Sequence, residues 1–513
     1  MAQSTRETER KYEAPAADDT SWLPDLTDVD AIASVVDRGT DDLDAVYYDT
    51  VDLRLVDASA PLRRRTGGAD AGWHLKLPLS GDSREELRAP LSDTVPEDLR
   101  DLVLSRTRGA ELRPVVRLRT ERHRRELVDA GGTVLGELSI DAVEAESLLA
   151  GATRASWTEL EVELSEGTDP ELLRAVDKVL REAGVKRLPG PSKLARALEE
   201  TAVGAPRLPD TRSEDVVAGS AGDLVLGYVE KQVRTLVALD PAVRRNLPDS
   251  VHRMRVACRR LRSVLRSYRS VLDRAATDPV RGELKWLAGE LGGERDHEVL
   301  QERLDAGLGA LPRELVLGPV TARLQAWHVT KSSEARTRTQ DALASPRYLA
   351  LLDSLAGLVA RPPLRRKAAA RKPKDVLAKA VLKEYDRFAG RVGIALKTPP
   401  GPERDAALHQ ARKAAKKARY VTEPARASLG KPAQRLGKRV KGVQKVLGDH
   451  QDSVVARAEL RRMAVAAGTS GEASFTWGLL YGREQTVAGE RQRELPKAWA
   501  RASKPALRKA LRR

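Results

Sequence analysis

Two carboxylates and an ammonium alternate near the start of the chain, in Glu7-Thr8-Glu9-Arg10-Lys11. In a β-strand this spacing places Glu7, Glu9 and Lys11 on one face, with successive members about 7 Å apart. Carboxylate oxygens are the ligands that a hard divalent cation prefers, and an ammonium can bind the phosphate group that such a cation carries. The same alternation is typical of a solvated edge strand, so its meaning depends on the elements around it.

The segments between residues 45 and 164 predict the elements that would position this motif. They are short, alternate between apolar and polar residues, and are separated by turn signals such as Arg65-Thr66-Gly67-Gly68 and Ala130-Gly131-Gly132. The clearest strand candidates are residues 45–48, 73–77, 115–119, 136–140 and 158–164. One alternate set of positions is charged where a packed core needs apolar side chains, so we expect an antiparallel β-barrel around a wet cavity. Helices are expected at residues 28–36 and 170–183.

Charge divides the chain into two parts. Residues 1–200 carry 28 basic and 41 acidic side chains, a net charge of −13, whereas residues 201–513 carry 62 basic and 33 acidic side chains, a net charge of +29. We expect the basic part to meet a polyanion. Cys258 is the only cysteine, which excludes disulfide scaffolds and cysteine-based zinc sites. Neither a signal segment nor an apolar run long enough to cross a membrane is evident, so we expect a cytosolic protein with no membrane partner.

The second part of the chain contains an internal repeat. Residues 201–220, rich in Ala, Gly, Pro and Ser, predict a linker, and the period of 3.6 that follows predicts an all-helical domain over residues 221–510. A histidine and three basic residues recur there with the same spacing, first as His252, Arg255, Arg259 and Arg262 and then, 157 residues later, as His409, Arg412, Lys416 and Arg419. We therefore expect a duplicated unit, over about residues 221–360 and 375–510, that forms two pseudo-symmetric four-helix bundles.

The two basic stripes predict an anion site. Like charges at this spacing repel one another unless something neutralises them. A solvated helix face explains one stripe, but it does not require the spacing to recur. Two facing stripes would line one basic channel, in which protonated histidines would bind phosphate. Asp296, Asp449 and Asp452 are either ion-pair partners that orient the arginines or purely structural residues, and the sequence favours neither.

Four motifs of the helical part resemble the CHAD domain, over about residues 215–510. They are His252-Arg253-Met254-Arg255-Val256 with Arg259-Arg260-Leu261-Arg262, Leu291-Gly292-Gly293-Glu294-Arg295-Asp296, His409-Gln410-Ala411-Arg412-Lys413 with Lys416 and Arg419-Tyr420, and Leu447-Gly448-Asp449-His450-Gln451-Asp452. The resemblance implies a pair of helical bundles that bind inorganic polyphosphate in a basic groove. Polyphosphate contacts are then expected from His252, Arg255, Arg259, Arg260, Arg262, Lys285, Arg295, His409, Arg412, Lys413, Lys416, Arg419 and Lys441. Lys416 stands where the first copy has Arg259, and it keeps the charge but loses bidentate contact.

The first 200 residues resemble the CYTH domain, a triphosphate tunnel metalloenzyme. The resemblance rests, in this order, on Glu7-x-Glu9-x-Lys11, Tyr47-Tyr48-Asp49-Thr50, Leu62-Arg63-Arg64-Arg65, Trp73-His74-Leu75-Lys76, Arg122, Asp141, Glu159-Leu160-Glu161-Val162-Glu163 and Ser192-Lys193. It implies an antiparallel barrel whose tunnel binds a magnesium or manganese complex of a triphosphate.

The residue types fit that chemistry. Glu159, Glu161 and Glu163 alternate and form a second acidic row that matches Glu7 and Glu9. The expected ligands of Mg²⁺ or Mn²⁺ are Glu7, Glu9, Asp141, Glu159, Glu161 and Glu163. The expected triphosphate contacts are Lys11, Arg63, Arg65, Lys76, Arg119, Arg122 and Lys193, and the catalytic candidates are Glu7, Glu9 and Lys11. Arg119 and Arg122 face opposite ways in a regular strand, and we favour Arg122 for the tunnel.

The leading hypothesis is a metal-dependent hydrolase of inorganic triphosphate or polyphosphate ends, fused to a module that binds polyphosphate and could associate with polyphosphate granules. A rival substrate is an organic triphosphate, either thiamine triphosphate or ATP for an adenylate cyclase. Such a substrate needs aromatic residues near the tunnel mouth, for which Trp73 and Trp157 are the candidates. A non-enzymatic protein that binds or targets polyphosphate is the alternative from another class. A nucleic-acid partner is disfavoured because recognition motifs and stacking aromatic residues are missing.

Overall fold

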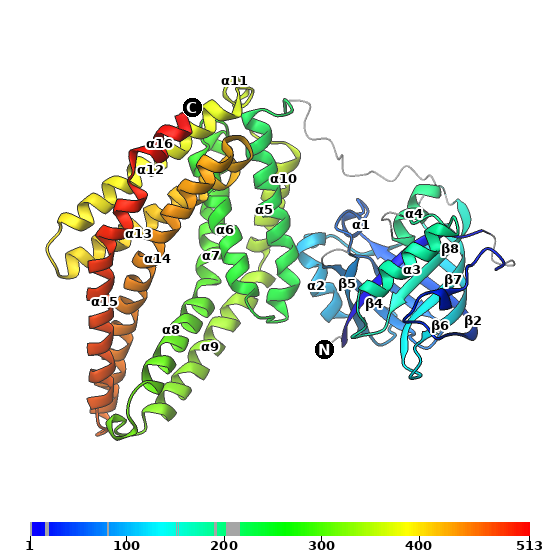
Figure 1. The fold of residues 1–513 in the computed structure, drawn as a ribbon, viewed down its shortest axis with the longest axis horizontal. Coiled ribbons are helices and arrows are strands. Elements are labelled where there is room, and N and C mark those ends of the chain that lie inside the picture. The colour runs from blue at the N-terminus through cyan, green and yellow to red at the C-terminus, as the bar shows by residue number, and fades with distance from the viewer. Residues whose placement is uncertain are drawn as a thin grey trace. The chain divides into compact units, whose positions relative to one another are not determined.

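The chain folds into two compact units, residues 1–210 and 211–513, in the computed structural model (Figure 1). The structure describes residues 3–15, 20–79, 82–149, 151, 153–188, 192–201 and 216–512. Most of the predicted linker, residues 202–215, lies outside this described part of the chain.

Eight antiparallel strands close the first unit into a barrel in the order β1-β5-β4-β3-β2-β6-β7-β8. They are β1 (Gln3–Glu13), β2 (Ser34–Asp49), β3 (Leu62–Thr66), β4 (Gly72–Pro78), β5 (Ser83–Ala89), β6 (Arg113–Val128), β7 (Val134–Ser147) and β8 (Arg154–Leu164). β1 closes the barrel because its first half pairs with β5 and its second half with β8. All five strand candidates fall within these strands, and the predicted barrel is confirmed.

Short helices surround the barrel: α1 (Arg54–Asp57), α2 (Glu97–Thr107), α3 (Glu171–Glu182) and α4 (Lys193–Glu200). α3 confirms the helix predicted at residues 170–183. The helix predicted at residues 28–36 is wrong, since only the 3₁₀ turn η1 (Leu26–Asp28) forms before β2 begins at Ser34. Val35 pairs with Leu127 on β6, and the β-branched side chains of Val35 and Val36 favour that ladder over a helix.

A tight turn fixes the hairpin of β3 and β4. Gly67 in this turn has a φ of +81°, and a Cβ atom there would lie 2.0 Å from the carbonyl oxygen of Asp42. Only glycine fits so close to a neighbouring backbone. The turn therefore holds β3, with Arg63 and Arg65, tightly against β2.

The second unit is all-helical over its described residues, as predicted. The first repeat contains α5 (Ala221–Arg244), α6 (Ser250–Ser267), α7 (Arg274–Glu290), α8 (Gly292–Gly309), η2 (Arg313–Leu315), α9 (Val320–Ala344) and α10 (Pro346–Ala360). The short α11 (Arg366–Ala369) leads to the second repeat, α12 (Pro373–Lys397), α13 (Pro402–Tyr420), α14 (Thr422–Thr469), α15 (Phe475–Ala502) and α16 (Pro505–Arg512). None of the helices described is long and apolar enough to cross a membrane.

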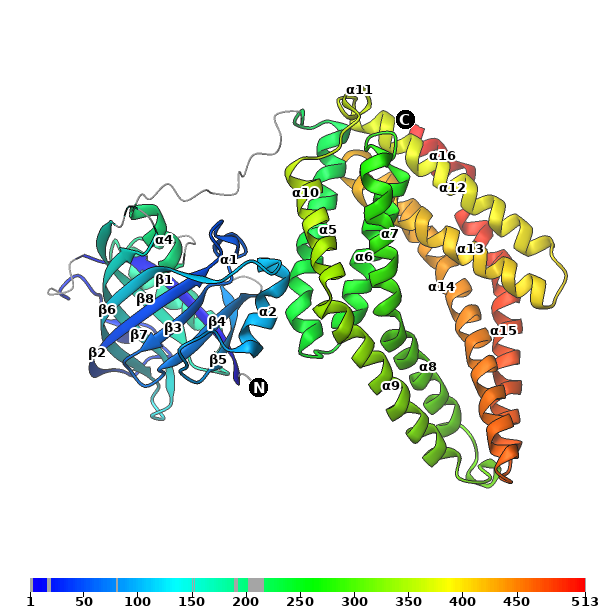
Figure 2. The ribbon, with the colours of Figure 1, turned by 180° about the vertical axis from the view of Figure 1, so that it is seen from behind.

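The two repeats pack in the same way. In the first, α5, α6, α7 and α10 form one set of packed helices, and in the second, α12, α13, the first half of α14, and α16 form another. The α8–α9 and α14–α15 hairpins extend beyond these sets and meet each other (Figure 2). Both sets share one apolar core of Leu, Val and Ala, in which α6 contacts α13. The basic stripes of the two repeats are thereby brought to one place.

Candidate functional site

The barrel interior is the charged face that the alternation predicts. On β1, Glu7, Glu9 and Lys11 all line a cavity of about 70 Å³ inside the barrel. Glu9 pairs directly with Glu163 of β8, and Lys11 pairs with Glu161. Because residues directly opposite each other share a face of the sheet, the two predicted acidic rows meet along this ladder. We call the charged cavity the tunnel.

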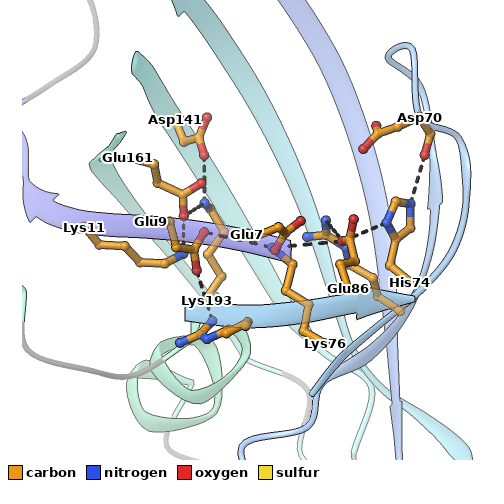
Figure 3. A network of polar contacts seen from close by, with 12 residues as sticks. Glu7, Glu9, Lys11, Asp70, His74, Lys76, Glu86, Asp141, Glu161 and Lys193 are labelled. Carbon is orange, nitrogen blue, oxygen red and sulfur yellow. Dashed lines mark hydrogen bonds and ion pairs between the residues drawn. The ribbon is translucent and has the colours of Figure 1, made fainter. Parts of the chain in front are cut away.

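Three buried carboxylates, Asp141, Glu159 and Glu161, form a carboxylate cluster in one wall of the barrel. Figure 3 shows two of them, Asp141 and Glu161, beside Lys193. One oxygen of each lies within 4.8 Å of the other two. Lys193 Nζ lies 2.7 Å from Asp141, 2.9 Å from Glu159 and 2.6 Å from Glu161. Arg122 donates two hydrogen bonds to Asp141, of 2.8 and 2.7 Å, and a third to Glu161 of 2.9 Å. Burial opposes ionisation, but these cations outweigh it and hold the pKa values of Asp141 and Glu161 below their usual range.

A second pair of carboxylates, Glu7 and Glu9, shares the ammonium of Lys76. Its Nζ lies 2.6 Å from Glu7 and 3.9 Å from Glu9, which also accepts a 3.0 Å hydrogen bond from Arg84. Burial raises the pKa of Glu7 to about 7, since Lys76 offsets it only in part. Burial also acts on Glu9, but the charges of Lys11 and Lys76 outweigh it and lower that pKa to about 2. At neutral pH, Glu9 is therefore charged, and Glu7 is poised to gain or lose a proton.

Two guanidinium groups on β3, Arg63 and Arg65, form the basic side of the tunnel. Arg63 donates a 3.3 Å hydrogen bond to the hydroxyl of Tyr47, and Arg65 pairs with Asp70. The Nε of each arginine is buried without a hydrogen-bond partner among the described residues. Burial and the charge of Arg63 lower the pKa of Arg65 to about 9. Buried guanidinium groups with unpaired N–H donors are suited to bind an anion with several oxygens, such as a phosphate chain.

Glu86 of β5 is a tunnel carboxylate that the sequence analysis missed. It is buried, lies 2.9 Å from Nδ1 of His74 and pairs with Arg88. Nε2 of His74 lies 2.9 Å from the carbonyl oxygen of Asp70, which fixes the imidazole between the two (Figure 3). The signal was present, because Arg84, Glu86 and Arg88 alternate as the other tunnel residues do.

Arg119 lies outside the tunnel. Its side chain is exposed on the outer face of β6, beside a surface pocket that Asp44 and Glu144 also line. Arg122 lies three residues further along β6, and the pairing of β6 with β2 and β7 is regular between the two positions. Its side chain therefore points to the opposite face, into the barrel. All other residues predicted for the barrel site line the tunnel or belong to the carboxylate cluster.

The carboxylate cluster fits a divalent cation. Its ligand atoms are all carboxylate oxygens, it is buried, and the lowered pKa values of Asp141 and Glu161 keep these two carboxylates charged; oxygen donors of this kind are the ones that Mg²⁺ and Mn²⁺ prefer. Asp141, Glu159 and Glu161 could therefore hold such an ion in the same barrel as the basic side of the tunnel.

The helical unit contains a second candidate site, a groove of about 760 Å³ to which α6, α7, α8, α13 and α14 contribute. We call it the basic groove. Twelve arginine and lysine side chains line it, against two aspartates, so its potential is strongly positive. The predicted residues that line it are His252, Arg255, Arg259, Arg262, Lys285, Arg295, His409, Arg412, Lys413 and Lys416.

An arginine–aspartate pair recurs in both halves of the groove. Arg255 donates two hydrogen bonds to Asp296, of 3.1 and 3.2 Å, and Arg412 donates one of 3.5 Å to Asp452. For Asp296 and Asp452 this favours the first of the two sequence alternatives, in which the aspartates orient the arginines. Asp449 is not part of the groove lining.

Three of the residues predicted to bind polyphosphate lie outside the groove lining. Arg260 pairs with Glu423 at 2.9 Å, Arg419 lies 4.6 Å above the ring of Tyr420, and Lys441 is exposed on α14. The groove also has four basic residues that the sequence analysis missed, namely Arg266, Arg281, Arg303 and Lys417. The motifs do not show how far the groove extends along its helices, which is why these residues were not found.

The crowding of positive charge perturbs the groove residues themselves. Burial, together with the charges of Arg412 and Arg259, lowers the pKa of Lys416 to about 7. Burial likewise lowers the pKa values of His252 and His409. An anion in the groove would relieve this repulsion and restore the charged forms.

Comparison with known proteins identifies a domain in each of the two units. The model of the CYTH domain matches residues 5–198, and that of the CHAD domain matches residues 227–461. Two proteins of Mycobacterium tuberculosis, uncharacterized protein MT2285 (strain CDC 1551 / Oshkosh) and uncharacterized protein Rv2226 (strain ATCC 25618 / H37Rv), are each 38% identical over 519 residues. Each alignment covers 98% of this chain and 97% of the relative.

Two solved structures are similar to part of the chain. PptA from Streptomyces chartreusis is 23% identical over 55% of this chain and 99% of its own, with a TM-score of 0.46. The CHAD domain from the plant Ricinus communis is 22% identical over 58% of this chain and 93% of its own, with a TM-score of 0.41. These likenesses are too distant to add to the argument. The matched domains and the full-length relatives show that the chain belongs to the family of proteins in which a CYTH domain is followed by a CHAD domain.

Proposed function

We propose that the barrel hydrolyses inorganic triphosphate, or the ends of polyphosphate chains, with Mg²⁺ or Mn²⁺, and that the helical unit binds inorganic polyphosphate. One observation carries the proposal for the barrel. A carboxylate cluster suited to a cation and two guanidinium groups suited to phosphate belong to one enclosed site. Membership of the CYTH–CHAD family supports the same assignment.

The chain's own residues have distinct tasks in this proposal. A bound divalent cation would neutralise phosphate oxygens and position water for attack. Arg63 and Arg65 would hold the phosphates that are not transferred, and Lys11 and Lys76 would add point charges. Glu7, whose pKa is about 7, is suited to accept a proton from the attacking water.

The aromatic residues favour an inorganic substrate over an organic one. Trp73 and Trp157, the two candidates to stack on a base or thiazolium ring, are both buried in apolar clusters of the barrel domain. The indole of Trp157 is further committed to a 2.7 Å hydrogen bond to Glu159. Among the described tunnel residues, Tyr47 and His74 are the only rings, and both are hydrogen-bonded to charged tunnel side chains. Both side chains are also buried, so they offer little ring surface on which a base or a thiazolium ring could stack.

The charge of the basic groove supports polyphosphate binding by the helical unit. Its twelve cations face one cavity, and one arginine of each repeat is held by an aspartate of the groove, Arg255 by Asp296 and Arg412 by Asp452. A flexible, base-free polyanion needs this kind of dense positive lining and no aromatic stacking.

The test for the barrel is phosphate release from triphosphate with added Mg²⁺ or Mn²⁺. We expect hydrolysis by the wild-type protein and its loss in Glu9→Ala, while Glu97→Ala, an exposed glutamate of α2, serves as the matched control. Hydrolysis that survives Glu9→Ala would contradict the assignment. Tight binding of triphosphate without any release of phosphate would instead favour the non-enzymatic alternative.

The test for the groove is retention of long-chain polyphosphate. We expect it to be lost when His252, Arg255, His409 and Arg412 are all replaced by Ala. The control removes the same kind of charge from the exposed residues Arg435, Lys438 and Lys445 of α14, which lie outside the groove lining. Equal losses in the two variants would show that net charge alone retains the polymer.

A further inference from the structure

Lys193 occupies the position that a cation would take in the carboxylate cluster. Its buried ammonium is within 2.9 Å of an oxygen from each of Asp141, Glu159 and Glu161, and these three oxygen-bearing groups are the ones that could ligate a metal ion. A divalent ion bound by three oxygens would lie about 2–2.6 Å from each, close to where the ammonium now lies. The ammonium and the ion therefore compete for the same oxygens.

Cations already surround the cluster. Besides Lys193, Lys11 pairs with Glu161 and lies 3.7 Å from Glu159, Arg122 bridges Asp141 and Glu161, and Arg196 lies 3.9 Å from Glu159. A divalent ion added to this arrangement would leave uncompensated positive charge in a buried site. Either a cation must leave the cluster, or an anion must arrive with the ion.

Lys193 is the cation best placed to leave. Lys11 lies on the part of β1 that pairs with β8, and Arg122 holds Asp141 with two parallel hydrogen bonds. Lys193 is instead the first residue of α4, where the positive end of the helix dipole disfavours its ammonium. The helix itself is anchored, since Leu194 and Ala197 are buried in an apolar cluster and Ser192 caps its first turn. The side chain can therefore turn without movement of the helix.

We propose that Lys193 is an internal competitor of the divalent cation, which leaves the carboxylate cluster for the phosphate chain when the cation binds. Lys193 also lines the tunnel, so its ammonium has a phosphate-binding position within reach. Cation and triphosphate would then bind cooperatively: the cation releases the lysine, and the lysine joins the arginines in holding the phosphates. This inference rests on the proposed function of the tunnel, and extends it by coupling its two ligands.

The test measures Mn²⁺ binding by the full chain, with and without the non-hydrolysable analogue imidotriphosphate, by isothermal titration calorimetry. Without the analogue, we expect Lys193→Met to bind Mn²⁺ about tenfold more tightly than the wild type, and the analogue to tighten Mn²⁺ binding less in the variant than in the wild type. Lys193→Gln, which can still donate to the carboxylates, should change in the same direction if Lys193→Met does not fold. Lys178→Met, an exposed lysine of α3, is the control and should behave as the wild type.

The outcomes distinguish the competition between Lys193 and the cation from the proposed substrate of the tunnel. Equal Mn²⁺ affinities of the wild type and both Lys193 variants, measured without the analogue, would overturn the competition. If Mn²⁺ binds more tightly to the variants but the analogue binds to none of the proteins, the competition stands and the proposed substrate is wrong.

Discussion

Polyphosphate binding should be accompanied by proton uptake at Lys416 of the basic groove. Burial and the neighbouring arginines lower its pKa from 10.5 to about 7, so at pH 8 the side chain is largely neutral before an anion binds. The charged groups that act on it are Arg255, Arg259, Arg412 and Asp296. A phosphate chain placed among them reverses the sign of the surrounding potential and stabilises the ammonium form.

The size of the proton uptake follows from the lowered pKa of Lys416. With a pKa of about 7, roughly one tenth of the side chains are protonated at pH 8, and a pKa restored toward 10.5 makes that fraction nearly complete. Binding should therefore take up about 0.9 proton per groove at this pH. Because the complex binds more protons than the free protein, affinity should fall as pH rises above 7, by up to about tenfold between pH 8 and pH 9. His252 and His409, whose pKa values are lowered below 6.5, are neutral at pH 8 and contribute little.

The assay is calorimetric titration of polyphosphate at pH 8 in two buffers of different ionisation enthalpy, which gives the number of protons taken up. Lys416→Arg keeps the positive charge but stays protonated throughout, so it should bind without this uptake and with a flatter dependence on pH. The same proton uptake in the wild type and Lys416→Arg would refute the reasoning, as would an affinity that rises with pH in this range.

Three further predictions concern the tunnel and the groove. Glu86→Gln leaves buried cations without their counter-charge, and we expect it to lower the free energy of unfolding by about 3 kcal/mol in denaturant titrations, whereas the half-buried Glu85→Gln should cost less than about 1 kcal/mol. The raised pKa of Glu7 means that the folded protein favours the protonated form of this side chain. The resulting contribution to stability, about 3 kcal/mol, is complete below pH 4.5 and is lost as pH rises through about 7. Without divalent cations, Glu7→Gln should therefore be more stable than the wild type at pH 8 but not at pH 4. In the groove, Arg259→Gln should reduce the slope of log affinity for polyphosphate against log salt by about 0.7, and Lys445→Gln, exposed outside the groove, should leave it unchanged.

The strand and helix patterns predicted the fold well because both units follow their periodicities over long segments. Alternation placed Glu7, Glu9 and Lys11 on one face, and the long regular strand β6 kept Arg122 inside and Arg119 outside. The failure at residues 28–36 has the opposite cause. There the chain has no strong period, and pairing with β6 decides the structure.

The composition of the candidate sites was harder to predict, because it depends on which strands and helices become neighbours. Glu86 belongs to the tunnel because β5 pairs with β1; the alternation of Arg84, Glu86 and Arg88 marks one face of β5 but does not show that this face turns inward. Lys193 was expected to contact phosphate, but its three carboxylate partners come from β7 and β8 and are revealed only by the closed barrel. In the groove, Arg419 differs from its counterpart Arg262 because α13 ends at Tyr420, over whose ring the guanidinium lies.

The central claim is that the carboxylate cluster supports metal-dependent hydrolysis of linked phosphates. The most direct measurement is the rate of phosphate release from inorganic triphosphate over a titration of Mn²⁺, for the wild type, Glu161→Gln and the control Glu144→Gln on the exposed outer face of β7. We predict turnover that requires Mn²⁺ in the wild type and in Glu144→Gln, and a loss of about 100-fold or more in Glu161→Gln. Turnover by Glu161→Gln at the wild-type rate and with the same dependence on Mn²⁺ would contradict the account.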